Sequence, residues 1–445
     1  MSFNIGLSGL QAAAADLKVT GNNIANSSTI GFKKSRAEFA DIYANSFSSC
    51  VNKSAVGVRL AGVVQQFAQG NLELTGNTLD MAINGEGFFV LRNDVGQNEM
   101  VYTRNGTFQV DREGYVVSSA GKRLQAYPPK IANSDIADFD SGKLTDLQLP
   151  LDNMGAKSTT EVDITFNLNA DEEVITGAGG PAFGWPALPD TAPDPNSYNW
   201  STTYQVYDSL GSPRDVTMYF VKTGALTWEV NVGMYDVNNV TPPDPPVMID
   251  ATGTGGPVEI VFKVDGTIDT VNGATVPDAV AAVIPISMPA FTDNGAAALV
   301  SSIKLDNATQ YSSSKNSVID LTQDGYSSGT LSGFDVDADG VVFSRYSNGQ
   351  SFILGQVAMA NFKNSQGLQQ VGDNNWVQSY ESGDPIYGGA GDGRLGSIQS
   401  GEIENSNVDL TEELVNLITA QRSYEANAKT ISTADQMTQT ILNIR

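Results

Sequence analysis

One group of acidic residues in the sequence has a spacing that could bind a cation. Asp335, Asp337 and Asp339 alternate with other residues and are followed by Gly340, as at the start of a calcium-binding loop. The twelfth position of such a loop needs a bidentate glutamate, but Tyr346 stands there, and the flanking residues favour strands rather than helices. We therefore expect a tight β-turn, and the sequence leaves open whether these carboxylates bind any cation.

A second group of residues matches part of a catalytic signature. Ser312 and Lys315, together with Lys222–Gly224, match two fragments found in penicillin-binding proteins and serine β-lactamases. Their order along the chain is inverted, and such short matches arise by chance in a serine-rich sequence. The chain also has no histidine, which removes most transition-metal sites and every Ser-His or Cys-His mechanism. We expect no enzymatic activity, no metal site and no cofactor.

Composition narrows the class of protein further. Cys50 is the single cysteine, so no disulfide can form within the chain, and no basic cluster near it favours a reactive thiol. A formal net charge of −25 disfavours binding to nucleic acid and to anionic membranes. No apolar run reaches the roughly 18 residues of a membrane-spanning helix, and the N-terminus does not read as a signal peptide. Composition alone predicts a cytosolic protein that binds neither nucleic acid nor membrane.

Both ends of the chain carry apolar residues at helical spacing. In residues 1–27 and 405–445 these residues lie three and four positions apart, a period near 3.5 that is typical of a coiled-coil seam. Neither helix could bury its apolar stripe alone, so we predict that the helices pack on each other or on copies of the same chain. The predicted seam consists of Leu7, Leu10, Ala14, Leu17 and Ile24 in the first helix and Leu410, Leu414, Leu417, Tyr424, Ala428 and Ile431 in the second.

Between the helices the sequence predicts β structure. Asn-Gly and other turn residues separate short runs of alternating apolar residues, as in β-hairpins. Most of the 18 prolines lie in one central segment, which we interpret as a second β domain inserted into the first. The expected fold class is mainly β with terminal α-helices and two nested β domains. The expected domains are a terminal helical coiled-coil domain (1–27 and 405–445), an extended connector (28–70 and 365–404), an inner β domain (71–145 and 316–364) and an outer inserted β domain (146–315).

The first helix ends in Asn22-Asn23-Ile24-Ala25-Asn26, followed by Gly31-Phe32-Lys33, and the last helix contains Gln421-Arg422. These motifs at both ends resemble one family, the axial rod and hook proteins of the bacterial flagellum. Within the chain, Tyr207–Gly211 and Tyr346–Gln350 resemble segments of the hook proteins of this family, whereas rod proteins are much shorter and lack a large inserted domain. The terminal residues that carry the resemblance are Asn22, Asn23, Ala25, Asn26, Thr29, Gly31, Phe32 and Lys33 at the start and Gln421 and Arg422 near the end.

The resemblance implies a structural role. It implies a subunit that polymerises into the flagellar hook, a curved hollow tube that acts as a universal joint and transmits motor torque from rod to filament. The partners it implies are further copies of the chain, the distal rod protein, the hook cap, the hook–filament junction proteins and the flagellar type III export apparatus. Export by that route needs no cleaved signal peptide, so the expected location is the extracellular hook at the basal body, which replaces the cytosolic expectation from composition.

Two other functions stay open on the sequence. One is a distal rod protein or a hook-associated junction protein of the same axial family. The other belongs to a different class, an extracellular β protein that binds calcium or glycans. Neither a calcium-binding nor a glycan-binding role accounts for the paired terminal helices.

Overall fold

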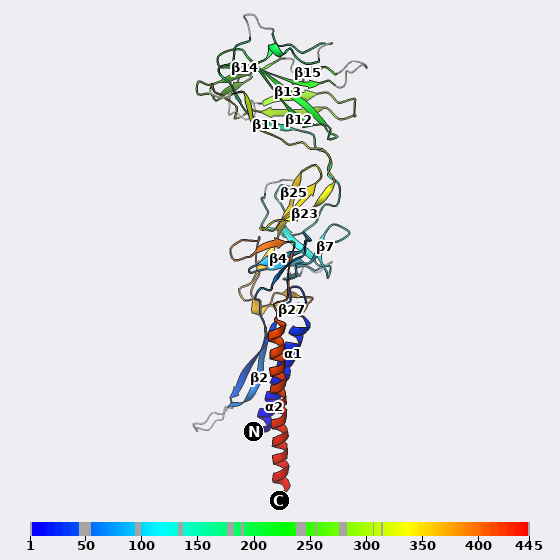
Figure 1. The fold of residues 1–445 in the computed structure, drawn as a ribbon, viewed down its shortest axis with the longest axis vertical. Helices are drawn as coiled ribbons and strands as arrows, with labels where there is room; N and C mark the ends of the chain where they lie inside the picture. The colour runs from blue at the N-terminus through cyan, green and yellow to red at the C-terminus, as the bar shows by residue number, and fades with distance from the viewer. Residues whose placement is uncertain are drawn as a thin grey trace. The chain divides into compact units, whose positions relative to one another are not determined.

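The computed structural model describes residues 2–43, 55–93, 99–131, 137–175, 182–187, 191–236, 246–253, 256–275, 283–305, 307–312 and 315–443. Cys50, predicted to be inert, lies outside these residues. The chain divides into two compact units, one made of Met1–Leu151, Ser332–Arg345 and Ser351–Arg445 and the other of Asp152–Leu331 and Tyr346–Gln350. The expected fold class, mainly β with a helix at each end, is confirmed (Figure 1).

The two long helices belong to the first unit and pack against each other. Helix α1 (Ser2–Ala25) and helix α2 (Leu410–Asn443) lie side by side in Figure 1 and run antiparallel, because Asn23 contacts Glu413 whereas Gly6 lies against Ile431. Asp409 caps α2 as its sequence position suggests, since its carboxylate accepts the backbone N–H of Thr411 at 2.8 Å. Neither helix, over its described residues, has the length and apolar content needed to cross a membrane.

The segment after α1 differs from the extended connector expected at 28–70. Strands β1 (Ser35–Tyr43) and β2 (Ala55–Gln65) pair antiparallel as a hairpin, and both contact α1. Val58 and Leu60 alternate as in a strand with one face on a neighbour, a short-range signal that the sequence analysis missed, and a bulge in the pairing brings Val63 to the same face as Leu60. The chain therefore turns back along α1 instead of leading away from it.

The β part of the first unit is built around one 13-stranded sheet. Its main path runs β23-β24-β25-β9-β5-β6-β28-β27. Two separate two-stranded sheets, β3 with β31 and β30 with β4, also belong to this unit. The segment expected as the connector 365–404 supplies β27 to β31 and so belongs to these sheets. The strands are β3 (Leu72–Leu74), β4 (Met81–Asn84), β5 (Phe88–Arg92), β6 (Met100–Thr103), β7 (Phe108–Val110), β8 (Val116–Ser118), β9 (Arg123–Tyr127), β10 (Thr145–Asp146), β23 (Leu331–Val336), β24 (Val341–Tyr346), β25 (Ser351–Val357), β26 (Met359–Asn361), β27 (Gln369–Gly372), β28 (Asn375–Val377), β29 (Ile386–Gly388), β30 (Ser397–Ser400) and β31 (Glu402–Glu404).

The Asp-rich segment forms the tight turn between β23 and β24 that the sequence predicts. The carboxylate of Asp337 accepts the backbone N–H groups of Asp339 at 3.0 Å and Val341 at 2.8 Å, and Gly340 takes the positive φ of 75° that closes the turn. Asp335 pairs with Arg345. Among the described residues no group of three or more His, Cys, Asp or Glu is arranged to hold a metal ion.

The second unit is a sandwich of two sheets. A five-stranded sheet (β19-β20-β11-β21, with β22 on β11) and a seven-stranded sheet (β12-β13-β14-β16-β17-β18, with β15 on β14) share one core. The strands are β11 (Glu161–Leu168), β12 (Trp200–Tyr207), β13 (Pro213–Lys222), β14 (Thr227–Tyr235), β15 (Met248–Asp250), β16 (Val258–Phe262), β17 (Ile268–Val271), β18 (Ala274–Thr275), β19 (Val283–Met288), β20 (Leu299–Lys304), β21 (Thr309–Gln310) and β22 (Ser317–Gln323). Two short 3-10 turns complete the described elements, Pro195–Ser197 in this unit and Ser365–Gly367 in the first.

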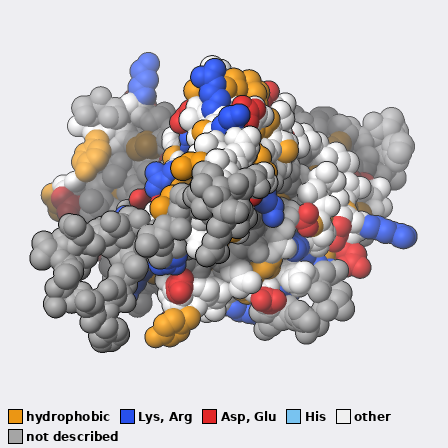
Figure 2. All heavy atoms as spheres, turned by 90° about the horizontal axis from the view of Figure 1, so that it is seen from below, with side chains coloured by type: hydrophobic (Ala, Val, Ile, Leu, Met, Phe, Trp, Pro, Cys, Tyr) orange, Lys and Arg blue, Asp and Glu red, His pale blue; other side chains and the backbone are white. Residues whose placement is uncertain are grey.

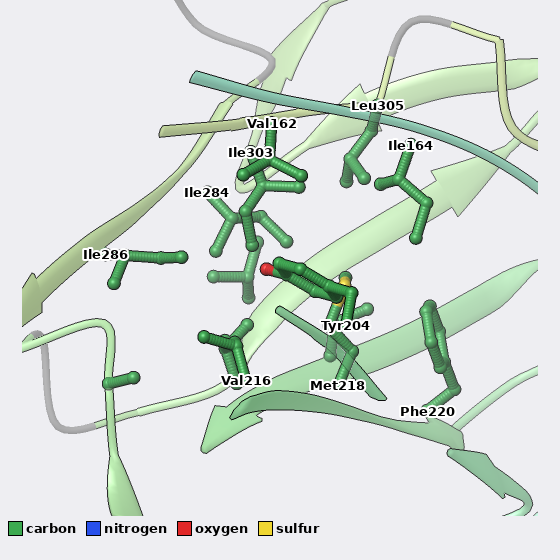
Figure 3. Close-up of a cluster of buried hydrophobic side chains, with 14 of the residues drawn as sticks. Val162, Ile164, Tyr204, Val216, Met218, Phe220, Ile284, Ile286, Ile303 and Leu305 are labelled. Atoms are coloured by element: carbon green, nitrogen blue, oxygen red, sulfur yellow. The ribbon is translucent and has the colours of Figure 1, made fainter. Parts of the chain in front are cut away.

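Three buried polar atoms of this unit lack a hydrogen-bond partner among the described residues: the Tyr204 hydroxyl, Nδ2 of Asn231 and Oγ of Ser301. In Figure 3 the ring of Tyr204 lies among the aliphatic side chains of both sheets, with Ile284 and Ile286 in view near its hydroxyl. The Tyr204 hydroxyl is buried without a hydrogen bond, and burial raises its pKa. An unpaired buried hydroxyl costs about 1–3 kcal/mol of desolvation.

Tyr204→Phe should therefore leave the second unit as stable as before or up to about 2 kcal/mol more stable, because the change removes that desolvation cost. Tyr219→Phe is the matched control, since the Tyr219 hydroxyl donates to Met248 Sδ at 3.1 Å and its loss should not stabilise. Urea unfolding of the purified chain measures both variants. A clear loss of stability in Tyr204→Phe, larger than that in Tyr219→Phe, would show that the hydroxyl has a partner.

Asp208, in the hook-like motif Tyr207–Gly211, organises a loop of the second unit. Its fully buried carboxylate accepts the backbone N–H groups of Leu210 and Ser212, the Asn294 amide at 2.7 Å and the Arg214 guanidinium at 3.1 Å. Burial alone would raise the pKa of Asp208, but these donors outweigh burial and hold that pKa below its ordinary value. The unfolded chain therefore binds a proton at this site more readily than the folded chain.

It follows that Asp208 stabilises the second unit above about pH 4, and that this contribution falls as the pH drops through the lowered pKa. Asp208→Asn should cost about 3 kcal/mol at pH 7, because it removes the charge that these donors surround. The difference from the unchanged chain should shrink below pH 4. Urea unfolding between pH 2 and pH 7 tests this, with the exposed Asp163→Asn as control. A difference that stays constant down to pH 2 would contradict the assignment.

Candidate assembly interface

Small residues form the line of closest contact between the two helices. Gly6, Ala13 and Thr20 recur every seven residues on α1, and all three are buried. A Cβ atom added to Gly9 would lie 2.6 Å from Oδ1 of Asn427, and one added to Gly6 would lie 3.0 Å from Cγ1 of Ile431. The helices therefore approach where α1 lacks bulk, as small residues allow backbones to do.

The predicted seam divides between this contact and the outer surface of the helix pair. In each helix the buried residues come one position before some of the predicted seam residues, as Gly6 comes before Leu7 and Glu413 before Leu414. One position corresponds to a rotation of about 100° around the helix axis, so the buried face is turned by that angle from the predicted one. The half-buried members are Leu10, Leu17, Ile24, Leu417, Ala428 and Ile431, and the exposed members are Leu7, Ala14, Leu410, Leu414 and Tyr424. The large exposed members, Leu7, Leu410, Leu414 and Tyr424, keep 37–49% of their surface open to solvent in the single chain, and their packing against other copies remains a prediction.

Further apolar side chains are exposed on the same helices. On α2, Leu414, Val415 and Ile418 are 49%, 59% and 51% exposed, and Ile5 extends the exposed set on α1. Figure 2, a view from below Figure 1, shows hydrophobic side chains at the surface with Lys and Arg side chains among them. Neighbouring exposed apolar side chains are typical of surfaces that contact other molecules. We define Leu414, Val415 and Ile418 as the outer stripe of α2.

The hairpin presents an apolar face of its own. Phe39 pairs across the strands with Leu60, and Ala37 pairs with Val63. Phe39, Leu60 and Val63 are all more than 40% exposed. The helical end of the first unit thus carries exposed apolar side chains on both its helices and its strands.

The Asn-rich motif ends α1 and ties it to the hairpin. The Asn23 amide pairs with both backbone groups of Ser35, donating to the carbonyl at 2.8 Å and accepting the N–H at 2.9 Å. Asn26 donates to the Asn22 carbonyl and accepts from the Thr29 hydroxyl, which closes the last turn of the helix. Asn23 is buried, Asn26 and Thr29 are half-buried, and Asn22 and Ala25 are exposed.

The motif Gly31-Phe32-Lys33 anchors this region to the β part of the first unit through a buried charge cluster. Lys33 Nζ lies 2.6 Å from Oε1 of Glu404, Arg104 lies 3.3 Å from Oε2, and the Gly70 N–H also donates to Oε1. The side chains of Lys33 and Glu404 are fully buried. One carboxylate therefore joins the start of the chain, the strand β31 that leads to α2, and the loop after β6.

Burial has opposing effects on the charges of this cluster. Desolvation lowers the pKa of Lys33 and of Arg104, and the negative charge of Glu404 partly restores both.

Gly31 has a positive φ of 70°, and an added Cβ atom would lie 2.6 Å from the Asn105 nitrogen, so the close approach needs glycine. Phe32 is buried beside this turn.

Asn407 forms a second link between the two ends of the chain. Its side-chain oxygen accepts the Lys34 N–H at 2.7 Å, and its amide donates to the carbonyls of Gln66 and Ala68. The residue Asn407, just before α2, is thus hydrogen-bonded both to the segment that follows α1 and to the segment that follows β2. Gln421 and Arg422, the C-terminal motif residues, are exposed on α2.

Sequence reasoning missed Glu404, Arg104 and Glu413. Their spacing along the chain carries no signal, because the groups that they contact lie hundreds of residues away. One signal was available for the helix contact, since Gly6, Ala13 and Thr20 share a period of seven that hydrophobicity alone does not reveal.

The residues of the catalytic signature lie in different surroundings: Lys222 is buried and donates to the carbonyls of Ala170 and Glu172, whereas Ser312 and Lys315 are exposed.

Family models match four parts of the chain. Residues 3–33 match the flagella basal body rod protein model, and residues 399–444 match the C-terminal model of the flagellar basal body rod FlgEFG proteins. Residues 82–180 match the D1 domain of the flagellar hook protein FlgE/F/G, and residues 167–326 match the D2 domain of the flagellar basal body protein FlaE.

Relatives match over the whole chain. The flagellar hook protein FlgE of Escherichia coli K12 is 37% identical over 445 residues, with all of both chains covered. The flagellar hook protein FlgE of Borreliella burgdorferi is 31% identical, covering all of this chain and 99% of its own. Among solved structures, the Helicobacter pylori flagellar hook protein FlgE2 matches with a TM-score of 0.52 and 16% identity, over 75% of this chain and all of that one, which shows a shared fold.

Proposed function

The chain belongs to the family of bacterial flagellar hook proteins, and from this premise we propose that it polymerises into the hook through its terminal helices. The observation that supports this most directly is the outer stripe of α2, where Leu414, Val415 and Ile418 are each about half exposed. Full burial of such a side chain is favourable by about 1.5–3 kcal/mol, so covering the exposed half contributes roughly 1 kcal/mol for each one. In a polymer every copy can bury the same surface.

We propose a structural role without catalysis, in which the tube acts as a universal joint between rod and filament. A bent tube must shorten along its inner side and lengthen along its outer side. Packed β units could slide past one another during rotation, as in a shear motion. The helix pair, tied to the β part through Glu404 and Asn407, would keep the subunits connected while this happens.

We favour the function of a hook subunit over that of a distal rod or junction protein, because hook proteins match this chain over its full length. Its proposed partners are further copies, the distal rod protein, the hook cap and the hook–filament junction proteins. We also propose that the chain reaches the extracellular hook at the basal body through the flagellar type III export apparatus, without a cleaved signal peptide.

Self-assembly of the purified chain tests the proposal. Concentrated monomer should form tubes visible by negative-stain electron microscopy, and sedimentation should give a critical concentration below which tubes vanish. A chain that stays monomeric at every concentration tested, even when seeded with sheared native hooks, would contradict self-assembly through the helices. Seeding is included because rod or cap proteins start the polymer in the proposed assembly.

A further inference from the structure

A polar pocket lies beside the helix contact in the first unit. It has a volume of about 340 Å³ and lies between the second half of α1, the base of the hairpin and the first turns of α2. Its charged lining consists of Asp16, Lys34, Arg36, Glu412 and Glu413. A pocket of this volume has room for a large side chain.

Glu413 is the unusual residue of this pocket. It is only 5% exposed, yet its carboxylate contacts no cation among the described residues. The polar side chain that reaches it is the neutral amide of Asn23, whose Nδ2 lies 3.3 Å from Oε2. The nearby cations are engaged elsewhere, because Lys34 pairs with Glu412 at 3.2 Å and Arg36 pairs with Glu38 at 2.8 Å. A buried carboxylate without a cation is costly to the single chain.

An unpaired cation is available on the opposite side of α2. Arg422 is exposed, and in the described part of the chain it forms neither an ion pair nor a hydrogen bond. It lies nine residues after Glu413, which at about 100° per residue places it on the far side of the helix. It also lies one turn beyond Ile418, so it continues the outer stripe. Arg422 of one copy therefore cannot serve its own Glu413, but it accompanies the stripe into any contact with another copy.

Resting on the proposed polymerisation, we infer that the pocket receives the Arg422 side chain of a second copy, whose guanidinium pairs with Glu413. A guanidinium suits the site because it donates several hydrogen bonds in a plane and can share a carboxylate and an amide oxygen. The pocket lining carries three carboxylates against two cations, and the cations Lys34 and Arg36 are already paired with Glu412 and Glu38, so the remaining negative charge favours a cation over an apolar side chain. The pairing would set the register of one α2 helix against the next.

A double-mutant cycle on the critical concentration of tube assembly tests this inference. Glu413→Gln and Arg422→Gln should each raise the critical concentration at least tenfold, and the double variant should raise it no further than the more severe single variant. Lys429→Gln is the matched control, because Lys429 is another exposed cation of α2 that forms no ion pair with any residue the structure describes. This variant should leave the critical concentration within twofold of the unchanged chain.

Several outcomes are distinguishable. If the two single effects multiply in the double variant, or if Arg422→Gln has no effect, the pairing is wrong although assembly stands. If the unchanged chain forms no tubes, the proposed function fails instead. Because Glu413→Gln alters a buried position, thermal unfolding of the monomer is measured alongside. If Glu413→Gln proves to be unfolded, the charge reversal Arg422→Glu tests the pairing instead. This variant should block assembly, because it would place two carboxylates together in every contact. Normal assembly of Arg422→Glu would overturn the inference.

Discussion

Glu404→Gln should lower the free energy of unfolding of the first unit by about 3–5 kcal/mol, the usual cost of removing one partner from a buried ion pair. The change keeps the shape of the side chain but leaves Lys33 and Arg104 in the interior without their anion. Glu38→Gln is the control, since Glu38 pairs with Arg36 at the surface, where ion pairs contribute about 0–1 kcal/mol.

Urea unfolding combined with hydrogen exchange on peptides from each unit makes the measurement, because it separates the first unit from the second. Protection should fall in residues around Lys33, Arg104 and Glu404 and stay unchanged in the second unit. Equal stability of Glu404→Gln and Glu38→Gln would contradict a stabilising role for the buried cluster.

The cost of this change should depend on pH in a defined direction. The folded-state pKa of Lys33 lies below its ordinary value, so the unfolded chain binds more protons at this site in the pH range between the folded pKa and about 10.5. Loss of Glu404 lowers the folded pKa further and widens that range. The deficit of Glu404→Gln should therefore shrink as the pH rises toward 10. A deficit that grows with pH would contradict this assignment of charges.

Ile418→Asp should abolish tube assembly while leaving the monomer folded. The side chain is about half exposed in the single chain, so a carboxylate there stays hydrated in the monomer. In the proposed polymer it would be buried without a partner, at a cost of about 3–5 kcal/mol, which raises the critical concentration by roughly two to four orders of magnitude.

Ser423→Asp adds the same charge to an exposed position on another side of α2 and should assemble at near-normal concentrations. Leu417→Asp, on the half-buried side, should block assembly and also weaken the helix pair, with the β parts still folded. Circular dichroism and sedimentation distinguish the three variants. Normal tubes from Ile418→Asp would remove the outer stripe from the interface.

The sequence predicts the elements of this fold better than it predicts their contacts. Periodicity identified both helices and their apolar content, and the turn at Asp337–Gly340 followed from local side-chain chemistry. The hairpin β1–β2 was missed because a strand signal interrupted by polar residues resembles a connector. The contact face of the helices was rotated from the predicted seam because the closest approach uses small residues, which a hydrophobicity pattern does not weight.

The candidate site was harder to predict because its polar part depends on tertiary contacts. Lys33 was identified through a motif resemblance, but its partner Glu404 lies 371 residues further along the chain. Glu413 lies in the first turn of α2, where the helix dipole favours acids, so its position in the sequence does not mark it as part of a site. Its burial becomes evident only once Asn23 and the hairpin base are placed against α2.

Electron microscopy of basal bodies from cells that lack this gene would show whether this chain builds the hook. We expect basal bodies that end at a bare rod, with the curved tube restored by the unchanged chain and not by Ile418→Asp. Curved hooks still present in the deletion cells would show that another protein builds the tube, and would contradict assignment of this chain as the hook subunit.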